Sequence, residues 1–444
     1  MEKGAKNVII LGAAGRDFHV FNVMFRKNKR YKVAAFTANQ IPFISGRTYP
    51  KELSGRLYPK GIKIYDESEL PELIRDFRID VCVMAYSDLR YQDVMEKASI
   101  ANAEGADFWL VSPAHTMLRS SKPVIAVCGV RTGVGKSQTS RYISIALRNA
   151  GFKVALVRHP MPYGILKEQV LQRFASIRDL DRYKTTIEER EDYEPHIKNG
   201  FVVYAGVDYE KVLRRAEAEA DIIVWDGGNN DAPFIKPDFM VVVADPLRAG
   251  DELTYYPGET VARMADLFVV NKVNSAKKED VERVVNGLKS INSKADVLLA
   301  DSVLSVDNPN AINGKKVLVV EDGPTITHGG MLFGAATVAA KEYGAKEIIN
   351  AKKYAVGTLK DVFARYPRLY NELPAVGYSP KQVRDLEATI NAAECDLVIS
   401  ATPTDIRHIL NANKPIVQVY YELRPHGVGL DEALEKFARK RHRQ

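Results

Sequence analysis

The residues with the clearest chemical role form a glycine-rich loop between an apolar strand and a helix. The loop begins at Gly129, directly after the apolar run 124–128. Successive backbone N–H groups in such a loop hold phosphate oxygens, the lysine reaches the outer phosphates, and the next hydroxyl binds Mg²⁺. We therefore predict a nucleotide-binding loop, with Lys136 as a catalytic cation and Ser137 as a metal ligand. Its residues are Gly129, Thr132, Gly133, Val134, Gly135, Lys136, Ser137 and Gln138.

The glycine spacing of this loop departs from the strict Walker pattern. Val130 stands where that pattern has glycine, and Gly129 comes one position earlier. The arrangement Gly-x-x-Thr-Gly-Val-Gly-Lys-Ser resembles the loop of dethiobiotin synthetase and its relatives, which include division-site and nitrogenase-type ATPases. In those ATPases a second lysine near the loop start contacts the phosphates of a partner subunit, and Arg131 occupies that position here. We expect Arg131 to be a second catalytic cation on the nucleotide phosphates, within its own subunit or across a dimer.

Two later segments are expected to complete the nucleotide site. The apolar run 222–225 delivers Asp226 to the end of a strand, where open α/β sheets place their ligands, so Asp226 is predicted to bind Mg²⁺. The segment 271–274, Asn-Lys-Val-Asn, resembles the base-reading motif of GTPases but has asparagine in place of the final aspartate. Because asparagine has only one acceptor for guanine, the sequence favours ATP, with GTP possible. Asn271 and Lys272 are predicted to line the base.

A second anion site is predicted farther along the chain. An apolar strand ends in Glu321 and Asp322, and Gly-Pro, two threonines, a histidine and two glycines follow before an apolar helix. Hydroxyls and open backbone N–H groups ahead of a helix bind anions. We expect substrate phosphate at Thr325 and Thr327, and catalytic roles for His328 and Glu321. In this arrangement Glu321 or Asp322 would orient His328 or serve as a base.

The N-terminal region offers cations for an acceptor. The glycine-rich turn 11–17 resembles the first turn of a Rossmann fold, but the next strand ends without a ribose-binding carboxylate, which argues against NAD. Arg16 lies in this turn, and Arg47 and Arg56 follow later glycines. Together with His159, in a proline-rich loop, these residues are predicted to bind the phosphate or carboxylate of a small acceptor.

A densely charged stretch, 186–196, leaves two interpretations open. A run of charges is usually the solvated face of a helix. This one also carries Tyr193 and His196, so it could instead present a base or a second metal ligand to the site.

The elements that must position these residues follow one pattern. Short β-branched runs alternate with helical stretches, which indicates βαβ units and parallel sheets. The predicted fold class is α/β, with a P-loop NTPase parallel-sheet core preceded by a Rossmann-like N-terminal domain. We expect an N-terminal acceptor-binding domain over residues 1–119 and a nucleotide-binding domain over 120–345. The C-terminal α/β segment, 346–444, is expected to pack on the P-loop sheet.

Composition excludes several classes of protein. The 444 residues are 46% hydrophobic and 27% charged, as in globular proteins, and no apolar run reaches the ~18 residues of a membrane span. Three dispersed cysteines and the lack of a signal-peptide pattern predict a cytoplasmic protein. The net charge of +7 is spread along the chain, so we expect no nucleic-acid or membrane partner. An anionic small molecule, such as a phosphorylated metabolite, suits this charge better.

The order of these segments resembles that of a known family. A Rossmann-like domain followed by 129–137, 188–196, 225–231, 321–331 and 394–405 is similar to the cyclic 2,3-diphosphoglycerate synthetase family, over nearly the whole chain. The resemblance implies that ATP phosphorylates one phosphate of 2,3-diphosphoglycerate. The neighbouring phosphate then closes an internal phosphoanhydride and expels phosphate. Such chemistry relies on cations, Mg²⁺ and N–H donors. By analogy with related P-loop proteins, the resemblance also implies a homodimer.

Two other functions fit parts of the sequence. A nucleotide switch or chaperone-type GTPase with a protein partner would need no second anion pocket, and 8 scattered histidines with 3 cysteines provide no metal store. A carboxylate-activating ligase would need a carboxylate and an amine acceptor. The extra arginines and the segment 321–331 favour an ATP-dependent synthetase that acts on 2,3-diphosphoglycerate or a similar phosphorylated acid.

Overall fold

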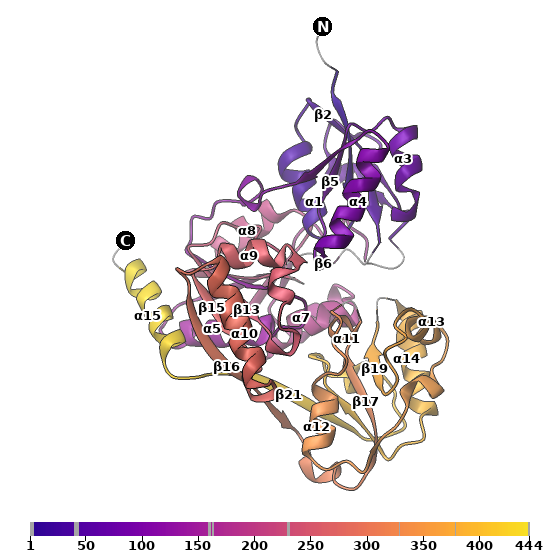
Figure 1. The fold of residues 1–444 in the computed structure, drawn as a ribbon, viewed down its shortest axis with the longest axis vertical. Helices are drawn as coiled ribbons and strands as arrows, with labels where there is room; N and C mark the ends of the chain where they lie inside the picture. Colours follow the sequence, from indigo (N-terminus) through magenta and orange to yellow (C-terminus); the bar gives the residue numbers. More distant parts are fainter. Residues whose placement is uncertain are drawn as a thin grey trace.

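The computed structural model describes residues 4–39, 44–158, 161, 164–228, 231–327, 329–377 and 379–442. Its strands form two large sheets and a small two-stranded one, and the largest sheet runs through two parts of the chain. The molecule therefore consists of three units, the indigo-purple, magenta-salmon and orange regions of Figure 1. The predicted α/β class with a P-loop core is confirmed. Within the described ranges, no helix is long and apolar enough to cross a membrane.

The N-terminal unit is a mainly parallel sheet. Its elements are β1 (Lys6–Leu11), α1 (Arg16–Val20), β2 (Tyr31–Ala38), β3 (Thr48–Tyr49), α2 (Lys51–Ser54), β4 (Ile62–Asp66), α3 (Leu70–Asp76), β5 (Val81–Met84), α4 (Tyr91–Ala103) and β7 (Asp107–Leu110). The strand order is β3-β4-β2-β1-β5-β7. From β1 the chain builds the sheet toward β2 and β4, and then crosses to β5 and β7 on the other side. The direction of building reverses between β1 and β5, which is where open α/β sheets bind ligands.

The P-loop unit follows. Its elements are β8 (Val124–Gly129), α5 (Lys136–Asn149), β9 (Val154–Arg158), β10 (Gln172–Phe174), α6 (Ile177–Arg182), α7 (Ile187–Lys198), β11 (Val202–Ala205), α8 (Tyr209–Glu217), β12 (Ile222–Asp226), β13 (Phe239–Ala244), α9 (Gly258–Arg263), β15 (Leu267–Val270), α10 (Lys278–Ile291) and β16 (Asp296–Val306). The order is β10-β11-β9-β12-β8-β13-β15-β16. The central strands β8 and β12 are buried along their whole length, as in sheets packed on both faces. The short strands β6 (Leu89–Arg90) and β14 (Tyr255–Tyr256) pair and join this unit to the N-terminal unit.

The third unit continues the same sheet. Its elements are β17 (Lys316–Asp322), α11 (Gly323–Ile326), α12 (Ala335–Glu342), β18 (Glu347–Ile348), α13 (Thr358–Arg365), β19 (Glu372–Ala375), α14 (Pro380–Ala392), β20 (Leu397–Ser400) and β21 (Ile416–Pro425). The first part of β16 pairs with β15 in parallel, and its second part pairs with β21 in antiparallel orientation. Beyond β21 the sheet runs through β20 to β17, which also pairs with β18 and β19.

The C-terminus returns from the third unit to the P-loop unit. Helix α15 (Gly429–His442) packs against α5, and its Leu430, Leu434 and Phe437 join the core of the P-loop unit (Figure 1). The expected boundary near residue 345 falls between α12 and β18, inside the third unit. β17 and α12 share a hydrophobic core with β20 and β21, so the third unit begins in β16.

Candidate functional site

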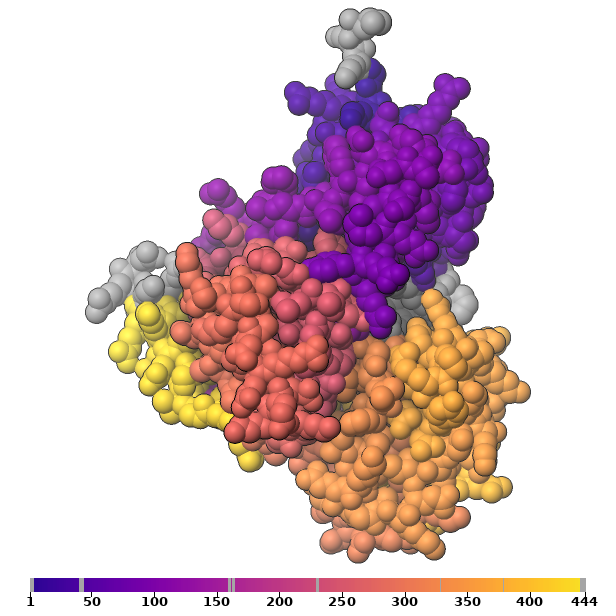
Figure 2. Space-filling view, in the orientation of Figure 1, coloured from indigo at the N-terminus to yellow at the C-terminus, as the bar shows by residue number. Residues whose placement is uncertain are grey.

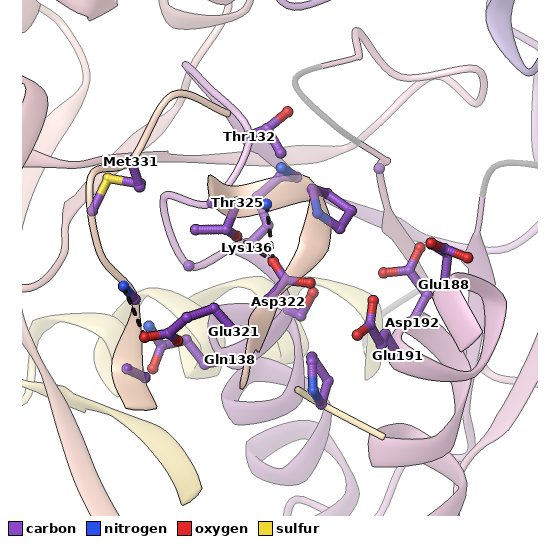
Figure 3. Close-up of a pocket in the computed structure, with 18 of the residues that line it drawn as sticks. Thr132, Lys136, Gln138, Glu188, Glu191, Asp192, Glu321, Asp322, Thr325 and Met331 are labelled. Carbon is purple, nitrogen blue, oxygen red and sulfur yellow. Dashed lines mark hydrogen bonds between the residues drawn. The ribbon is translucent and has the colours of Figure 1, made fainter. Parts of the chain in front are cut away.

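A cavity of about 280 Å³ lies where the three units meet. The N-terminal unit contributes the turns after β1 and β5, the P-loop unit contributes the P-loop and α7, and the third unit contributes residues that follow β17. Figure 2 shows the purple, salmon and orange surfaces of the three units in contact, and Figure 3 shows part of the cavity lining. A ligand in this cavity would therefore contact all three units.

The P-loop adopts the backbone that phosphate binding requires. Gly133 and Gly135 have φ values of +78° and +106°, a left-handed region that glycine enters without strain. Lys136 begins α5 and is 8% exposed, and burial lowers the pKa of its ammonium group. Of the predicted loop residues, those that line the cavity are Thr132, Gly133, Gly135, Lys136, Ser137 and Gln138, whereas Gly129 and Val134 are buried beneath the loop.

Asn271 and Lys272 brace the P-loop. The fully buried amide of Asn271 donates to the carbonyl of Val134 at 3.0 Å. The Lys272 ammonium donates to the carbonyl of Gly133 at 2.7 Å and to Asp245 at 2.8 Å. Lys272 lines the cavity and Asn271 does not, so the structure places Asn271 behind the loop and not at the predicted base.

Asn274, at the position that reads guanine in GTPases, has its amide bound to the chain itself. It donates to the carbonyl of Ser302 at 3.1 Å, and its oxygen accepts from the backbone N–H of Ser302 at the same distance, 3.1 Å. Ser302 lines the cavity, whereas Asn274 does not. An amide that is engaged at both ends is not available for the hydrogen bonds that distinguish guanine.

Asp226 ends β12 in a fully buried position. Its Oδ2 accepts from Ser140 at 2.7 Å, and it lies 3.1 Å from Nε2 of His196 and 2.6 Å from a guanidinium nitrogen of Arg158. Burial raises the pKa of Asp226, but Arg158 and His196 lower it by more, so the net pKa lies below the usual range. Sequence reasoning missed Arg158. Its position at the end of β9, the next strand in the chain after the P-loop and α5, was the available signal.

The residues predicted to bind Mg²⁺ are compatible with that role. Ser137 lines the cavity. Oδ1 of Asp226 is buried and has no hydrogen-bond partner among the described residues. A divalent cation or its bound water satisfies such a bare carboxylate oxygen. Ser137 and Asp226 would thus hold Mg²⁺ near the nucleotide, where the ion supplies positive charge to the phosphates.

Arg131 is held outside this cavity. Its guanidinium donates to Asp88 at 2.7 Å and to the carbonyl of Gly329 at 3.1 Å, and it forms an ion pair with Asp251. The group also stacks on Tyr255, with 3.5 Å between Cζ and the ring centroid. Asp88 belongs to the N-terminal unit and Gly329 to the third unit. The side chain therefore fastens the three units together, instead of facing nucleotide phosphates as the sequence predicted.

Glu321 fills the anion site that was predicted ahead of α12. Its carboxylate accepts from the backbone N–H groups of Gly334, Ala336 and Thr337 at 3.1, 3.0 and 2.8 Å. Burial raises the pKa of Glu321 to about 7, and these hydrogen bonds limit the rise. The protein supplies its own anion to this helix, so a substrate phosphate has no open N–H groups there.

The other residues of this segment lie in different places. Thr325 lines the cavity and donates from its hydroxyl to Asp322. Thr327 donates to a backbone carbonyl of its own turn at 2.7 Å and lies outside the cavity. His328 and His159, two predicted site residues, lie outside the described part of the chain.

The charged stretch 186–196 forms most of α7, and of the two interpretations left open for it, the solvated face is wrong. Glu188 and Glu191 are only 3% and 4% exposed. The helix is covered by the third unit: Glu188 accepts from the backbone N–H of Gly377 at 3.1 Å, and Glu194 accepts from Thr404 at 2.7 Å. The charges therefore point into a junction between units.

Four carboxyl groups form what we call the acidic wall of the cavity: Glu188, Glu191 and Asp192 from α7, and Asp322 at the end of β17. In Figure 3, Asp322 lies between Glu321 and the acids of α7. Burial raises the pKa of Glu188 to about 8. Burial and neighbouring acids raise the pKa of Glu191 and of Asp322, whose side chains are hydrogen-bonded to each other. A base or a second metal ligand was the functional role predicted for this stretch, and an acidic pocket was not.

Of the three N-terminal arginines, Arg16 is the one at the cavity. It is 3% exposed and donates to the carbonyls of Ala232 and Val111 at 3.5 and 3.4 Å. Arg47 donates to a backbone carbonyl in the P-loop unit, and Arg56 is exposed. Neither Arg47 nor Arg56 lines the cavity.

The P-loop and its parallel sheet define the class of protein, a P-loop nucleotide-binding protein. No family model matches the chain. The chain is 56% identical over 439 residues to the arginine synthetase ArcE of Thermococcus kodakarensis, and the match covers 99% of this chain and 98% of the relative. The chain therefore belongs to the family of this synthetase.

Two further similarities are more distant. The cyclic 2,3-diphosphoglycerate synthetase of Thermococcus sibiricus is 24% identical over 292 residues, which cover 61% of this chain and 65% of the relative. The structure of LpxK from Aquifex aeolicus with ATP matches 83% of this chain and 98% of that chain, with a TM-score of 0.46 and 12% identity. The resemblance predicted from the sequence is thus found, but the arginine synthetase is much more similar. Both curated relatives are synthetases, and with the P-loop they make this chain a synthetase-type enzyme.

Proposed function

We propose that the protein is an ATP-dependent synthetase that forms arginine. The observation that carries the proposal is the acidic wall, which shares the cavity with the P-loop. The phosphates of the nucleotide belong beside Lys136, while the acidic wall suits a cationic group. A guanidinium is planar and permanently charged, and it binds carboxylates through paired hydrogen bonds. The 56% identity to the arginine synthetase supports the same acceptor.

A second acceptor, 2,3-diphosphoglycerate, has the support of the 24% identical relative. Its negative charges suit this cavity less well. The buried cations near the P-loop already have acidic partners: Arg158 contacts Asp192 and Asp226, and Lys272 contacts Asp245. A polyanion would also lie beside the acidic wall, where it would oppose the ionisation of these carboxyl groups, whereas a cation favours it. We therefore place arginine first.

ATP is the nucleotide we propose. The engaged amide of Asn274 removes the contact that would select guanine. Leu304, Phe333 and Val338 line the same cavity and offer an apolar surface to a purine ring. This lining is compatible with adenine, which needs fewer polar partners than guanine.

The chemistry follows from the difference between arginine and its ureido analogue, citrulline, in which an oxygen replaces one nitrogen. The γ-phosphoryl group of ATP is transferred to the ureido oxygen, so that an O–P bond forms and ADP leaves. Ammonia then forms a C–N bond at the same carbon, the C–O bond breaks, and phosphate leaves with the oxygen and with the proton that ammonia gives up, so that the guanidinium remains. Lys136 would stabilise the transferred charge, as would Mg²⁺ held by Ser137 and Asp226. The acidic wall would hold the guanidinium product.

The test measures arginine formation and phosphate release from ATP with Mg²⁺, citrulline and ammonium. Parallel reactions replace citrulline with 2,3-diphosphoglycerate, or ATP with GTP. We expect arginine and phosphate in equal amounts, and a loss of at least about 100-fold in rate for Lys136→Ala. The matched control is Lys278→Ala, because the Lys278 side chain is 86% exposed in the same unit and should not affect the rate.

Two results would overturn the proposal. An anhydride resonance in phosphorus NMR with 2,3-diphosphoglycerate, without arginine formation from citrulline, would replace it with the cyclising reaction. Slow phosphate release that no acceptor stimulates would instead indicate a nucleotide switch.

A further inference from the structure

The wall of the cavity on the N-terminal side contains a buried arginine with incomplete contacts. Arg16 lines the cavity, and its terminal nitrogens donate only to two carbonyls, at 3.5 and 3.4 Å, near the limit for a hydrogen bond. Its Nε is buried and has no hydrogen-bond partner in the described structure. A buried guanidinium with such weak, neutral partners is suited to an anionic group of a ligand.

Two acids lie on the same wall. Asp17 follows Arg16, and its Oδ1 accepts from the backbone N–H groups of Ala14 and Phe18 at 2.6 and 2.7 Å. Asp231, from the P-loop unit, also lines the cavity and is 4% exposed. Burial, with the charge of Asp231, raises the pKa of Asp17 to about 7. The wall therefore presents a cation and two acids side by side.

The fold places this wall where a ligand is expected. The turn after β1 carries Arg16, the turn after β5 carries Ala85 and Ser87, and the sheet reverses its building direction between these two strands. Gly12 has a φ of +117°, and a Cβ there would collide with Asp17, so the turn requires glycine. This crevice opens into the same cavity as the P-loop.

We propose that Arg16, Asp17 and Asp231 bind the α-amino-acid head group of the acceptor. Arg16 holds the α-carboxylate, and the two acids hold the α-ammonium. The side-chain end of the acceptor then extends toward the P-loop and the acidic wall. The inference rests on the proposed function, because it takes the ligand to be arginine or a similar amino acid. It assigns recognition of the head group to the N-terminal turn and Asp231.

The test compares three ligands by calorimetry with the full-length protein in the presence of ADP. Arginine has the complete head group, agmatine lacks the carboxylate, and 5-guanidinopentanoate lacks the ammonium. We expect each loss to weaken binding by about 10- to 100-fold, the effect of one charge-assisted contact. Arg16→Gln should lower the affinity for arginine to that for agmatine, and the affinity for agmatine should not change. Asp231→Asn should lower the affinity for arginine to that for 5-guanidinopentanoate, and the affinity for 5-guanidinopentanoate should not change.

The control variant is Arg30→Gln, which changes an exposed arginine of the same unit and should bind arginine normally. ADP binding and thermal unfolding report whether each variant is folded. If Arg16→Gln does not fold, the affinities of the wild-type protein for the three ligands, and those of Asp231→Asn, still test the inference. The inference is overturned if wild-type protein binds agmatine as tightly as arginine. It is also overturned if Arg16→Gln lowers the affinities for arginine and agmatine by the same factor. Absence of both arginine binding and arginine formation would instead remove the proposed function.

Discussion

Burial acts on Glu188 and Asp226 in the same direction, but their neighbours lead to opposite results. Both carboxyl groups are almost completely removed from water, which favours the protonated form. Arg158 and His196 outweigh that effect at Asp226, and its pKa falls below the usual range. Glu188 has acidic neighbours and the backbone N–H of Gly377, and its pKa is raised to about 8. At neutral pH, Glu188 therefore keeps its proton in the free enzyme.

The affinity for a cationic acceptor should consequently rise with pH. Below about 8, Glu188 is protonated and attracts a guanidinium weakly; above that pH it is ionised and attracts it strongly. The raised pKa values of Glu191 and Asp322 act in the same direction. We expect arginine to bind more tightly as the pH rises through this pKa, with release of protons. Calorimetry in buffers of different ionisation enthalpy measures that release.

The control for this prediction is Glu188→Gln, which removes the titrating group and should reduce both the pH dependence and the proton release. Affinity that does not change with pH in the wild-type protein would contradict the role of the acidic wall.

At the scale of elements, the sequence predicted what is local and missed what is brought together by folding. The P-loop was predictable because its strand, loop and helix are consecutive. The partners that cover α7 come from Gly377 and Thr404, 189 and 210 positions beyond Glu188 and Glu194. A pattern of charges contains no information on such partners, so the sequence left open whether this stretch is a solvated face or part of the site. The cap that Glu321 provides to α12 has partners only 13 to 16 positions away, and it was missed because the sequence does not show whether a ligand or the chain itself occupies an anion site.

The contact between α7 and the third unit can be tested at Gly377. A Cβ at this position would lie 2.5–2.7 Å from three side-chain atoms of Ile187, which is 2% exposed. We expect Gly377→Ala to lower the free energy of unfolding by about 1–3 kcal/mol, the effect of overpacking a buried contact. Chemical denaturation measures the change. A Gly4→Ala variant, with no atom within 4 Å of the added Cβ, should match the wild type. Equal stability of both variants would show that α7 is not packed this tightly.

At the scale of the whole molecule, the cavity exists only while the three units are held together. Arg131 contacts Asp88, Asp251 and the carbonyl of Gly329, and it directly precedes Thr132 of the P-loop. The pairing of β6 with β14 makes a second connection between the first two units. The residue that was expected to bind phosphate thus connects the nucleotide loop to the assembly of the cavity.

Removal of this guanidinium should destabilise the assembly. Arg131→Gln leaves Asp88 and Asp251 without their guanidinium partner, and breaking a buried ion pair costs about 3–5 kcal/mol. We expect a lower unfolding temperature and faster hydrogen exchange in the turn after β5. In contrast, Arg75→Gln changes ion pairs of a side chain that is 52% exposed, and should cost less than about 1 kcal/mol. If Arg131→Gln instead binds ATP more weakly and is as stable as the wild type, Arg131 contacts the nucleotide phosphates, as the sequence predicted.

The division of the chain into units shows a further limit of sequence patterns. Strand β16 pairs with β15 over its first residues and with β21 over the rest. A strand has the same apolar character whichever neighbour it pairs with, so nothing in its residues marks the change of unit. The expected boundary near residue 345 was therefore placed at a later polar stretch.

The pairing of β16 with β21 also determines how the third unit can move. The two strands run antiparallel from Ala300 to Val306, opposite Pro425 to Val419, and both connect directly to the P-loop unit. The third unit is thus suspended from a two-stranded ribbon, and a hydrogen-bonded ribbon preserves its length and register while it twists. Opening of the cavity would therefore require this ribbon to twist, and the contacts of α7 and Arg131 with the third unit to break, so that entry of a ligand would depend on an angle rather than on a separation.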